Sequence, residues 1–132
     1  MKAVHVIRSG IFDVNSLVVL LKNNYCFVVD PAACTLSGDE NKITDYLKKQ
    51  NLQCVAIILT HSHFDHVTGI ATIKKMFPSC QIAIHEKEYS EFISTFFDVI
   101  DCLYSMKINF LNAYENIFVR MYCFLIVHLT IE

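Results

Sequence analysis

The sequence feature that most constrains the fold is an apolar run that ends in a cluster of histidines. Residues 54–59 read Cys-Val-Ala-Ile-Ile-Leu, and Thr-His-Ser-His-Phe-Asp-His follows at positions 60–66. An apolar run of this length, with almost no polar alternation, predicts a strand that is buried on both faces of a sheet. Ligands bind beyond the carboxyl ends of strands in α/β sheets, so the histidines lie where a site is expected.

Strands and helices alternate around this run. The pattern of apolar residues predicts strands at residues 3–7, 16–22, 25–30, 54–59 and 81–84, and helices at about 39–51, 67–77 and 86–97. Asn23 and Asn24 predict a hairpin turn between the second and third strands, because asparagine tolerates a positive φ. After this hairpin, strands and helices follow in turn, which is typical of the α/β class.

The first predicted helix carries its own signals. Ile43, Tyr46 and Leu47 follow the spacing of one helical face. Asp39 and Glu40 supply negative charge at the expected N-terminus, where the helix dipole favours it. We therefore expect this helix to begin near Asp39.

Length, charge and cysteine content narrow the class of protein. A chain of 132 residues with a net charge of −2 fits one domain and gives no reason to expect a nucleic acid or a membrane as partner. The N-terminus lacks the apolar stretch of a signal peptide, and no Cys-x-x-Cys pair occurs. We expect a reduced, cytoplasmic protein without a disulfide framework; its cysteines are Cys26, Cys34, Cys54, Cys80, Cys102 and Cys123.

The segment at residues 117–131 is largely apolar, with interruptions at Arg120, His128 and Thr130. It is shorter than the roughly 20 apolar residues that a membrane-spanning helix needs. We interpret it as two short buried strands. Because the sequence ends at Glu132, this β-prone segment has no following partner, and we expect it to promote self-association.

The histidine cluster has the chemistry of a metal site. His61 and His63 are two residues apart, so in extended backbone their side chains project to the same side and can hold one Zn²⁺-like ion. Asp65 and His66 follow where the turn leads into a helix and can point to a second metal position nearby. The alternative is a loop that is polar only for solubility, which the density of three histidines and one aspartate disfavours.

These residues carry a resemblance to a known family. The segment Thr60-His61-Ser62-His63-Phe64-Asp65-His66 resembles the T-H-x-H-x-D-H signature of the metallo-β-lactamase-fold hydrolases. The form with Phe64 is similar to that of the type II glyoxalases, the hydroxyacylglutathione hydrolases. Further similar residues occur at Asn15-Ser16, at Val28-Val29-Asp30-Pro31 and at Thr68-Gly69.

The resemblance implies a fold and a set of ligands. The fold is α/β, the N-terminal half of an αββα sandwich, with a mixed sheet that has its helices on one face. His61 and His63 are implied as ligands of the first metal, and Asp65 and His66 as ligands of the second. Asp65 is also implied as the catalytic residue that orients the nucleophilic hydroxide.

Two more residues are implied as supports of the ligand loop, namely Asp30 and Thr60. The related flavodiiron oxidoreductases have glutamate at the position of His63, so histidine favours a zinc hydrolase, with iron or manganese as alternative metals. The implied reaction is hydrolysis of a thioester such as an acyl-glutathione, or of a related ester, by a metal-bound hydroxide. Lactones and phosphodiesters are alternative small-molecule substrates.

Family members usually have well over 200 residues, and their second half supplies further metal ligands. We therefore expect residues 1–132 to form a C-terminally truncated domain that binds metal weakly by itself and has little activity. The alternative functions are a catalytically inert half-domain and a metal-binding fragment that depends on a partner chain. His128 does not match a ligand position, and we expect His5, His85 and Cys34 to lie outside the metal site.

Overall fold

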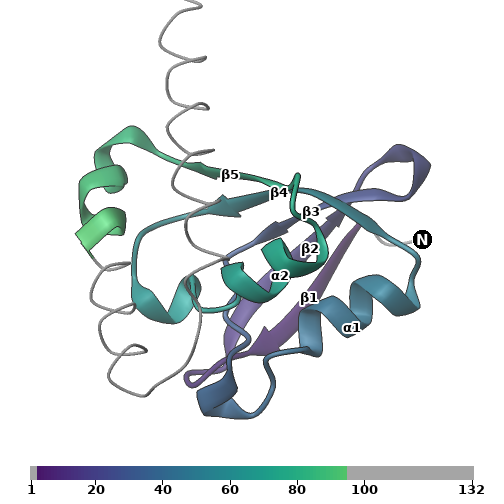
Figure 1. Cartoon of the computed structure of the whole chain (residues 1–132), viewed down its shortest axis with the longest axis horizontal. Coiled ribbons are helices and arrows are strands. Elements are labelled where there is room, and N and C mark those ends of the chain that lie inside the picture. The colour runs from purple at the N-terminus through teal and green to yellow at the C-terminus, as the bar shows by residue number, and fades with distance from the viewer. Residues whose placement is uncertain (1–2, 95–132) are drawn as a thin grey trace, which may run out of the picture.

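The computed structural model describes residues 3–94, and these residues form one mixed sheet with helices on one side (Figure 1). The five strands follow one another in the sheet in chain order, and neighbouring strands pair along their length. The pairs β1–β2 and β2–β3 are antiparallel, whereas β3–β4 and β4–β5 are parallel. The strands are β1 (Val4–Ser9), β2 (Val14–Leu20), β3 (Tyr25–Val29), β4 (Gln53–Leu59) and β5 (Gln81–Ile84).

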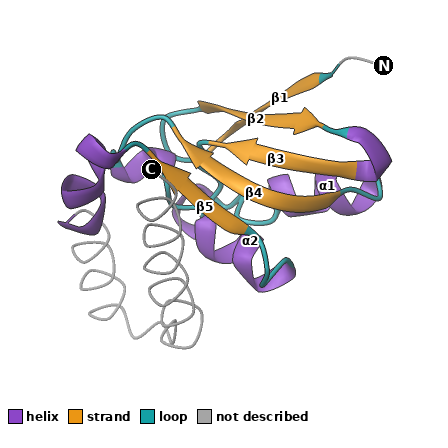
Figure 2. Ribbon diagram, turned by 90° about the horizontal axis from the view of Figure 1, so that it is seen from above, coloured by secondary structure: helices purple, strands orange, loops and turns teal. Residues whose placement is uncertain are grey.

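Two α-helices, α1 (Lys42–Lys49) and α2 (Ile70–Met76), cover the same face of the sheet (Figure 2). Ile43 and Leu47 of α1 and Ile70 and Ile73 of α2 are buried in one core with side chains from that face. Four short 3₁₀ turns lie between or after these strands and helices. Residues 89–94, after the last of these turns, are helical. These turns are η1 (Lys22–Asn24), η2 (Thr35–Ser37), η3 (Phe64–His66) and η4 (Glu86–Glu88). The predicted α/β class, with helices on one face of a mixed sheet, is confirmed.

The predicted hairpin is also confirmed. Strands β2 and β3 are antiparallel, and the turn between them contains Asn23 and Asn24, with φ of 59° and 61°. Asparagine visits this left-handed region more readily than most side chains. The two residues therefore set the register that pairs Leu20 with Cys26 and Leu17 with Val29.

Helix α1 begins three residues later than the sequence predicted. Asp39 precedes the helix, and its carboxylate accepts hydrogen bonds from the backbone N–H groups of Gly10 (2.9 Å) and Cys34 (3.0 Å). Asp39 therefore connects the β1–β2 turn to the loop after β3 and does not cap α1. Helix α2 also begins later than the predicted residue 67, at Ile70. Residues 64–66 form a separate 3₁₀ turn, η3, ahead of it.

The prediction that β4 is buried on both faces was only partly right. Cys54, Ile57 and Leu59 face the helices and are buried, but Ala56 and Ile58 on the other face are half-buried, and Val55 is 40% exposed. The strand register aligns a continuous apolar surface on this second face. Its members are Val4, Val6, Leu17, Val19, Phe27, Val29, Ala56, Ile58 and Ala83.

The expectations about the C-terminal segment and about membrane spans can be compared with the structure only where residues are described. The strands expected within residues 117–131, and self-association through them, lie outside the described residues. Among residues 3–94, no helix is long and apolar enough to cross a membrane.

Candidate metal site

The candidate site lies at one edge of the sheet, where three parallel strands end. Strand β3 is followed by Asp30, β4 by the turn at residues 60–66, and β5 by His85 and the turn η4. Because parallel strands point the same way, the three segments meet at the same edge. Strand β4 lies between β3 and β5, so the histidine turn has a neighbouring segment on each side.

Asp30 holds the beginning of the histidine turn. One carboxylate oxygen accepts a hydrogen bond from the backbone N–H of Thr60 (2.8 Å), and the other accepts one from the Thr60 hydroxyl (2.5 Å). The Asp30 side chain is only 9% exposed, and its backbone adopts a φ of 47°, which aspartate tolerates better than most residues. A buried carboxylate requires such donors, so Asp30 and Thr60 stabilise each other's position.

The Thr60 hydroxyl also determines which nitrogen of His61 carries the proton. It lies 2.8 Å from Nδ1 of His61. A hydroxyl has one hydrogen, and this hydrogen is donated to Asp30, so the hydroxyl must accept from Nδ1 of His61. In the neutral imidazole Nε2 is then unprotonated, which is the form that binds a metal ion.

The rings of His63 and His66 both lie next to the ring of His61. Its ring centroid lies 4.1 Å from that of His66 and 4.6 Å from that of His63. Asp65 lies beside this group, with Oδ2 at 3.5 Å from Nε2 of His66. All four residues implied by the signature are therefore neighbours, and Asp30 joins them from β3.

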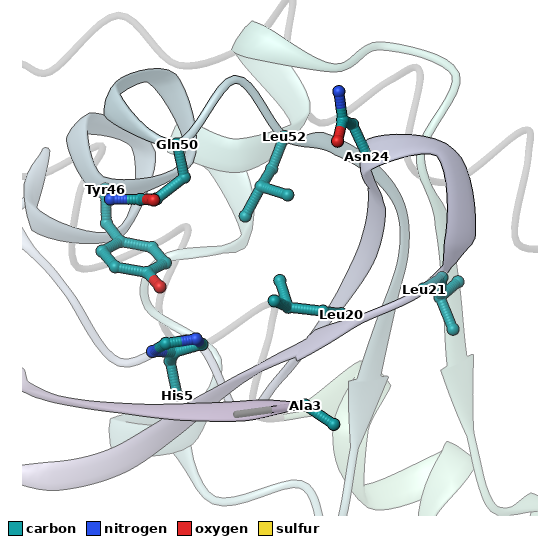
Figure 3. Close-up of a pocket in the computed structure, with 8 residues that line it drawn as sticks. All are labelled: Ala3, His5, Leu20, Leu21, Asn24, Tyr46, Gln50 and Leu52. Atoms are coloured by element: carbon teal, nitrogen blue, oxygen red, sulfur yellow. The ribbon is translucent and has the colours of Figure 1, made fainter. Parts of the chain in front are cut away.

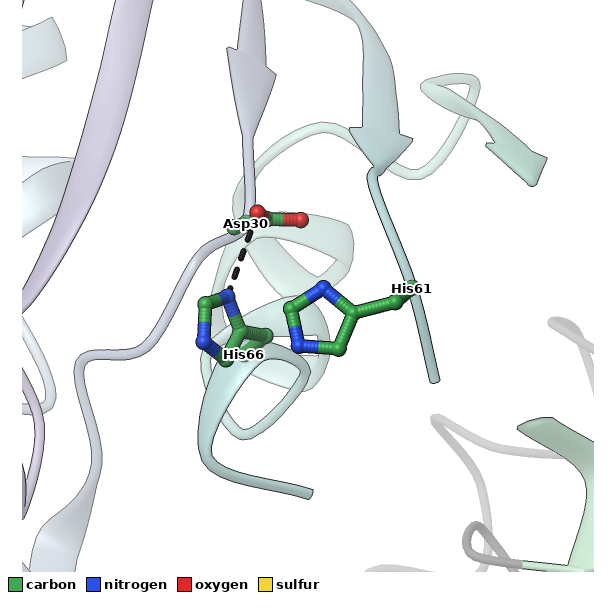
Figure 4. Close-up of side chains that lie close together, drawn as sticks. All are labelled: Asp30, His61 and His66. Atoms are coloured by element: carbon green, nitrogen blue, oxygen red, sulfur yellow. Dashed lines mark ion pairs between the residues drawn. The ribbon is translucent and has the colours of Figure 1, made fainter. Parts of the chain in front are cut away.

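One ring nitrogen of His66 lacks a hydrogen bond. Nδ1 lies 3.1 Å from Oδ2 of Asp30, close enough for an ion pair but not aligned for a hydrogen bond (Figure 4). Within residues 3–94 this buried atom has no hydrogen-bond partner. One ligand atom each from Asp30, His61 and His66 lies within 4.8 Å of the others. Imidazole nitrogens and carboxylate oxygens suit divalent metals such as zinc, so this donor set fits a metal ion.

The loop after β3 is fixed from two directions. From β2, the buried hydroxyl of Ser16 donates to the backbone oxygen of Asp30 (2.7 Å) and accepts from the N–H of Ala32 (3.1 Å). From the start of α2, the Thr68 hydroxyl donates to the Ala32 oxygen, and the Gly69 N–H donates to the Pro31 oxygen, both at 2.8 Å. Ser16, Thr68 and Gly69 belong to the segments that carry the family resemblance, and these contacts give them a structural role.

A contact on the far side of the turn was missed by sequence reasoning. Ser62, between two of the histidines, is fully buried, and its backbone N–H and hydroxyl both donate to Oε2 of Glu88, at 3.3 and 3.2 Å. Nothing in the local sequence marks Glu88, because the contact depends on β5 lying beside β4.

Within residues 3–94, the ligand group does not include His85, Cys34 or His5. His85 precedes η4, where its Nδ1 accepts from the N–H of Lys87 (3.2 Å). Cys34 contacts the Ser37 hydroxyl (3.2 Å). His5 packs against Tyr46, with ring centroids 5.6 Å apart, and lines a cavity of about 290 Å³ (Figure 3). That cavity also includes Leu20 and Leu52, at the end of the sheet opposite to the histidine turn.

Known proteins with similar sequences carry related names. The hydroxyacylglutathione hydrolase of Aeromonas salmonicida is 38% identical over 77 residues, which are 58% of this chain and 28% of that protein. The hydroxyacylglutathione hydrolase of Blochmanniella pennsylvanica is 36% identical over 75 residues, 56% of this chain and 28% of that protein. The probable metallo-hydrolase YqgX of Bacillus subtilis is 30% identical over 69 residues, 52% of this chain and 30% of that protein. The chain thus spans less than a third of each of these relatives.

A solved structure and a family description agree with these similarities. The BLEG-1 B3 metallo-beta-lactamase is similar in structure, with a TM-score of 0.54 and 28% sequence identity, over 64% of this chain and 38% of that one. The partial coverage fits the N-terminal half of the sandwich that the sequence implied. The family model of the metallo-beta-lactamase superfamily matches residues 9–97, which is more than half of the 132 residues. The chain therefore belongs to the metallo-beta-lactamase superfamily.

Proposed function

We propose that the chain provides the metal-binding turn of a glyoxalase II-like hydrolase, which cleaves a thioester or a related ester. The observation that carries this proposal is the convergence of Asp30, His61 and His66, whose ligand atoms lie within 4.8 Å of one another at the end of a parallel strand. The similarity to hydroxyacylglutathione hydrolases supports the same reaction class.

The ligands proposed from the family resemblance are His61, His63, Asp65 and His66, which would hold two divalent metal ions; His61 and His66 are the two of them that form the observed group with Asp30. Zinc is the proposed metal, with iron and manganese as alternatives that nitrogen and oxygen ligands also accept. When bound, such ions polarise the scissile carbonyl and lower the pKa of a water molecule, which makes it a nucleophile at neutral pH.

The chain's own residues would then have separate tasks. Asp65 would orient the attacking water by accepting its hydrogen bond, and it is the catalytic residue of this proposal. Asp30 and Thr60 would keep the turn and the His61 ring in place. The His61 ring is hydrogen-bonded to the Thr60 hydroxyl, and Thr60 in turn donates its N–H and its hydroxyl to the carboxylate of Asp30.

The proposed substrate is a small molecule with a thioester bond, such as an acyl-glutathione, and the proposed location is the cytoplasm. Cys26, Cys54 and Cys80 are buried in the core, where thiols behave as small apolar side chains. That use of cysteine is common in reducing compartments.

The experiment that tests the proposal has two parts. In the first, the full chain is titrated with Zn²⁺, Mn²⁺ and Fe²⁺, and binding is compared with that of the His61→Ala variant. In the second, the matching segment of the Aeromonas salmonicida hydrolase is replaced by that of this chain, and hydrolysis of an acyl-glutathione is assayed. We expect metal binding that depends on His61 and turnover that is lost in Asp65→Asn. A folded chimera that holds metal but leaves the thioester intact would contradict the proposal.

The second candidate function is a metal-binding fragment that needs a partner chain to complete its site. The apolar second face of the sheet favours it, since Val4 and Val6 are 42% and 59% exposed there. Size-exclusion chromatography combined with metal analysis separates the two candidates. A fragment of this kind would hold its metal only in an assembly with the partner.

A further inference from the structure

We propose that Glu88 is a positioning residue that holds the His61–His63 turn in the conformation needed for metal binding. This inference rests on the proposed function, because it assigns a task in the same metal site. Glu88 lies outside the histidine signature and reaches the site from η4, after β5.

The geometry of the turn explains why one carboxylate can control two histidines. The rings of His61 and His63 lie together, with centroids 4.6 Å apart, whereas the side chain of Ser62 between them contacts Glu88. Ser62 is fully buried, His61 is half-buried and His63 is exposed, so the buried serine holds the turn from the interior while the two histidines stay accessible to a ligand.

Both donors of Ser62 meet at a single oxygen atom. The N–H of Ser62 belongs to the peptide unit that joins it to His61, so a bond from this N–H to Glu88 restrains the orientation of that unit, which the ψ angle of His61 and the φ angle of Ser62 define together. The hydroxyl donates to the same Oε2 and anchors the side chain. Together the two contacts limit how far the turn can rotate.

Asp30 and Glu88 thus restrain His61 from opposite sides. Asp30, after β3, holds Thr60 immediately before His61, and Glu88, after β5, holds Ser62 immediately after it. The two carboxylates come from the segments that follow the two strands flanking β4 in the sheet. Residues that orient metal ligands in this way typically change metal affinity 10- to 100-fold when they are removed.

Glu88 itself has a fixed place. The turn η4 begins after His85, whose Nδ1 accepts from the N–H of Lys87, and the Glu88 N–H donates to the His85 oxygen (2.9 Å). Glu86 and Lys87 of the same turn are exposed, whereas Glu88 is half-buried. Glu86 therefore provides a matched control of the same residue type on the same element.

The test compares the full chain with Glu88→Ala, Glu88→Gln, Ser62→Ala and the control Glu86→Ala. Co²⁺ is the probe, because its visible spectrum reports the ligands and geometry of the bound ion. We expect Glu88→Ala to weaken Co²⁺ binding by about 10- to 100-fold and to change this spectrum. Glu88→Gln keeps an acceptor oxygen within reach of Ser62 and should bind Co²⁺ nearly as the original chain does. Glu86→Ala should leave binding and spectrum unchanged.

A measurement on the metal-free chain tests the contact itself. Hydrogen exchange of the Ser62 amide, followed by NMR, should be about five- to tenfold faster in Glu88→Ala, while the amides of β4 keep their protection. Unchanged exchange in that variant would overturn the inference.

The Co²⁺ titration separates the inference from the proposed function. If the original chain binds Co²⁺ through His61 and Glu88→Ala binds it equally well, the inference is wrong and the proposed function stands. If the His61→Ala variant binds Co²⁺ as tightly as the original chain does, the proposed function is wrong, and the role of Glu88 in metal binding is overturned with it.

Discussion

The Thr60 hydroxyl accepts a hydrogen bond from Nδ1 of His61 at 2.8 Å, because its own hydrogen is donated to Asp30. The three groups form a chain of hydrogen bonds that leaves Nε2 of His61 without a proton in the neutral ring. A side chain that lies outside the ligand set therefore selects the nitrogen that can bind a metal.

This relationship predicts the effect of changing Thr60. In Thr60→Val the hydroxyl is lost, so His61 should no longer be held in one tautomer, and metal affinity should fall about tenfold. Thr60→Ser keeps the hydroxyl and should retain both properties. The ¹⁵N chemical shifts of the His61 ring measure the tautomer, and a metal titration measures the affinity. A mixture of tautomers in the unaltered chain would contradict the assignment.

The histidines should differ in their importance for metal binding. His61→Ala and His66→Ala each remove a ring from the group formed with Asp30, and we expect each to lower metal affinity by at least about 100-fold. His85→Ala is the control, because that ring accepts a local hydrogen bond in η4 and lies outside this group. Isothermal titration of each variant with Zn²⁺ measures how much metal affinity it has lost. Equal losses in all three variants would mean that metal binds nonspecifically to imidazoles.

Most of the fold could be predicted from the sequence, because the strands carry strong local signals. The predicted strand at 81–84 matches β5, and the Asn23–Asn24 turn lies where it was expected. The start of α1 could not be predicted in the same way. Asp39 resembles a residue at a helix N-terminus, but tertiary contacts with Gly10 and Cys34 bind its carboxylate instead.

The candidate site shows the same division between local and distant signals. The histidine turn is contained in seven consecutive residues, so its signature is visible without a structure. Glu88 is 26 residues away from Ser62, and its contact follows from the pairing of β4 with β5. A single sequence contains no signal for that pair, because only the pairing of the two strands brings the serine and the glutamate together.

Gly69 should not accept a side chain, because the loop after β3 approaches it closely. A Cβ atom at this position would lie 3.0 Å from the Pro31 oxygen and 3.1 Å from the Ala33 oxygen. Both are backbone atoms of a loop that Ser16 also binds, so they cannot move independently of Asp30. We expect Gly69→Ala to lower the free energy of unfolding by about 1–3 kcal/mol, as overpacking does elsewhere. Urea denaturation measures this change, and an unchanged midpoint would contradict the close approach.

Asp39 should make the stability of the chain sensitive to acid. Burial raises the pKa of its carboxyl, but hydrogen bonds from Ser37, Cys34 and Gly10 and the charge of Lys42 together lower that pKa below the ordinary 3.8. A lowered pKa in the folded state means that the unfolded chain binds more protons near pH 4. The stabilisation is therefore complete well above pH 4 and is lost as the pH falls through the folded pKa.

The variant Asp39→Asn tests this sign. At pH 7 it should be less stable than the original chain, and the difference should shrink as the pH falls below about 4, because protonated Asp39 also lacks the charge. The control is Asp13→Asn, whose side chain is 66% exposed and forms a surface ion pair with Arg8 (3.2 Å), so its removal should change stability little. Urea midpoints at pH 7, 5 and 3 provide the comparison. A difference between Asp39→Asn and the original chain that grows in acid would show that the carboxyl is not stabilised in its charged form.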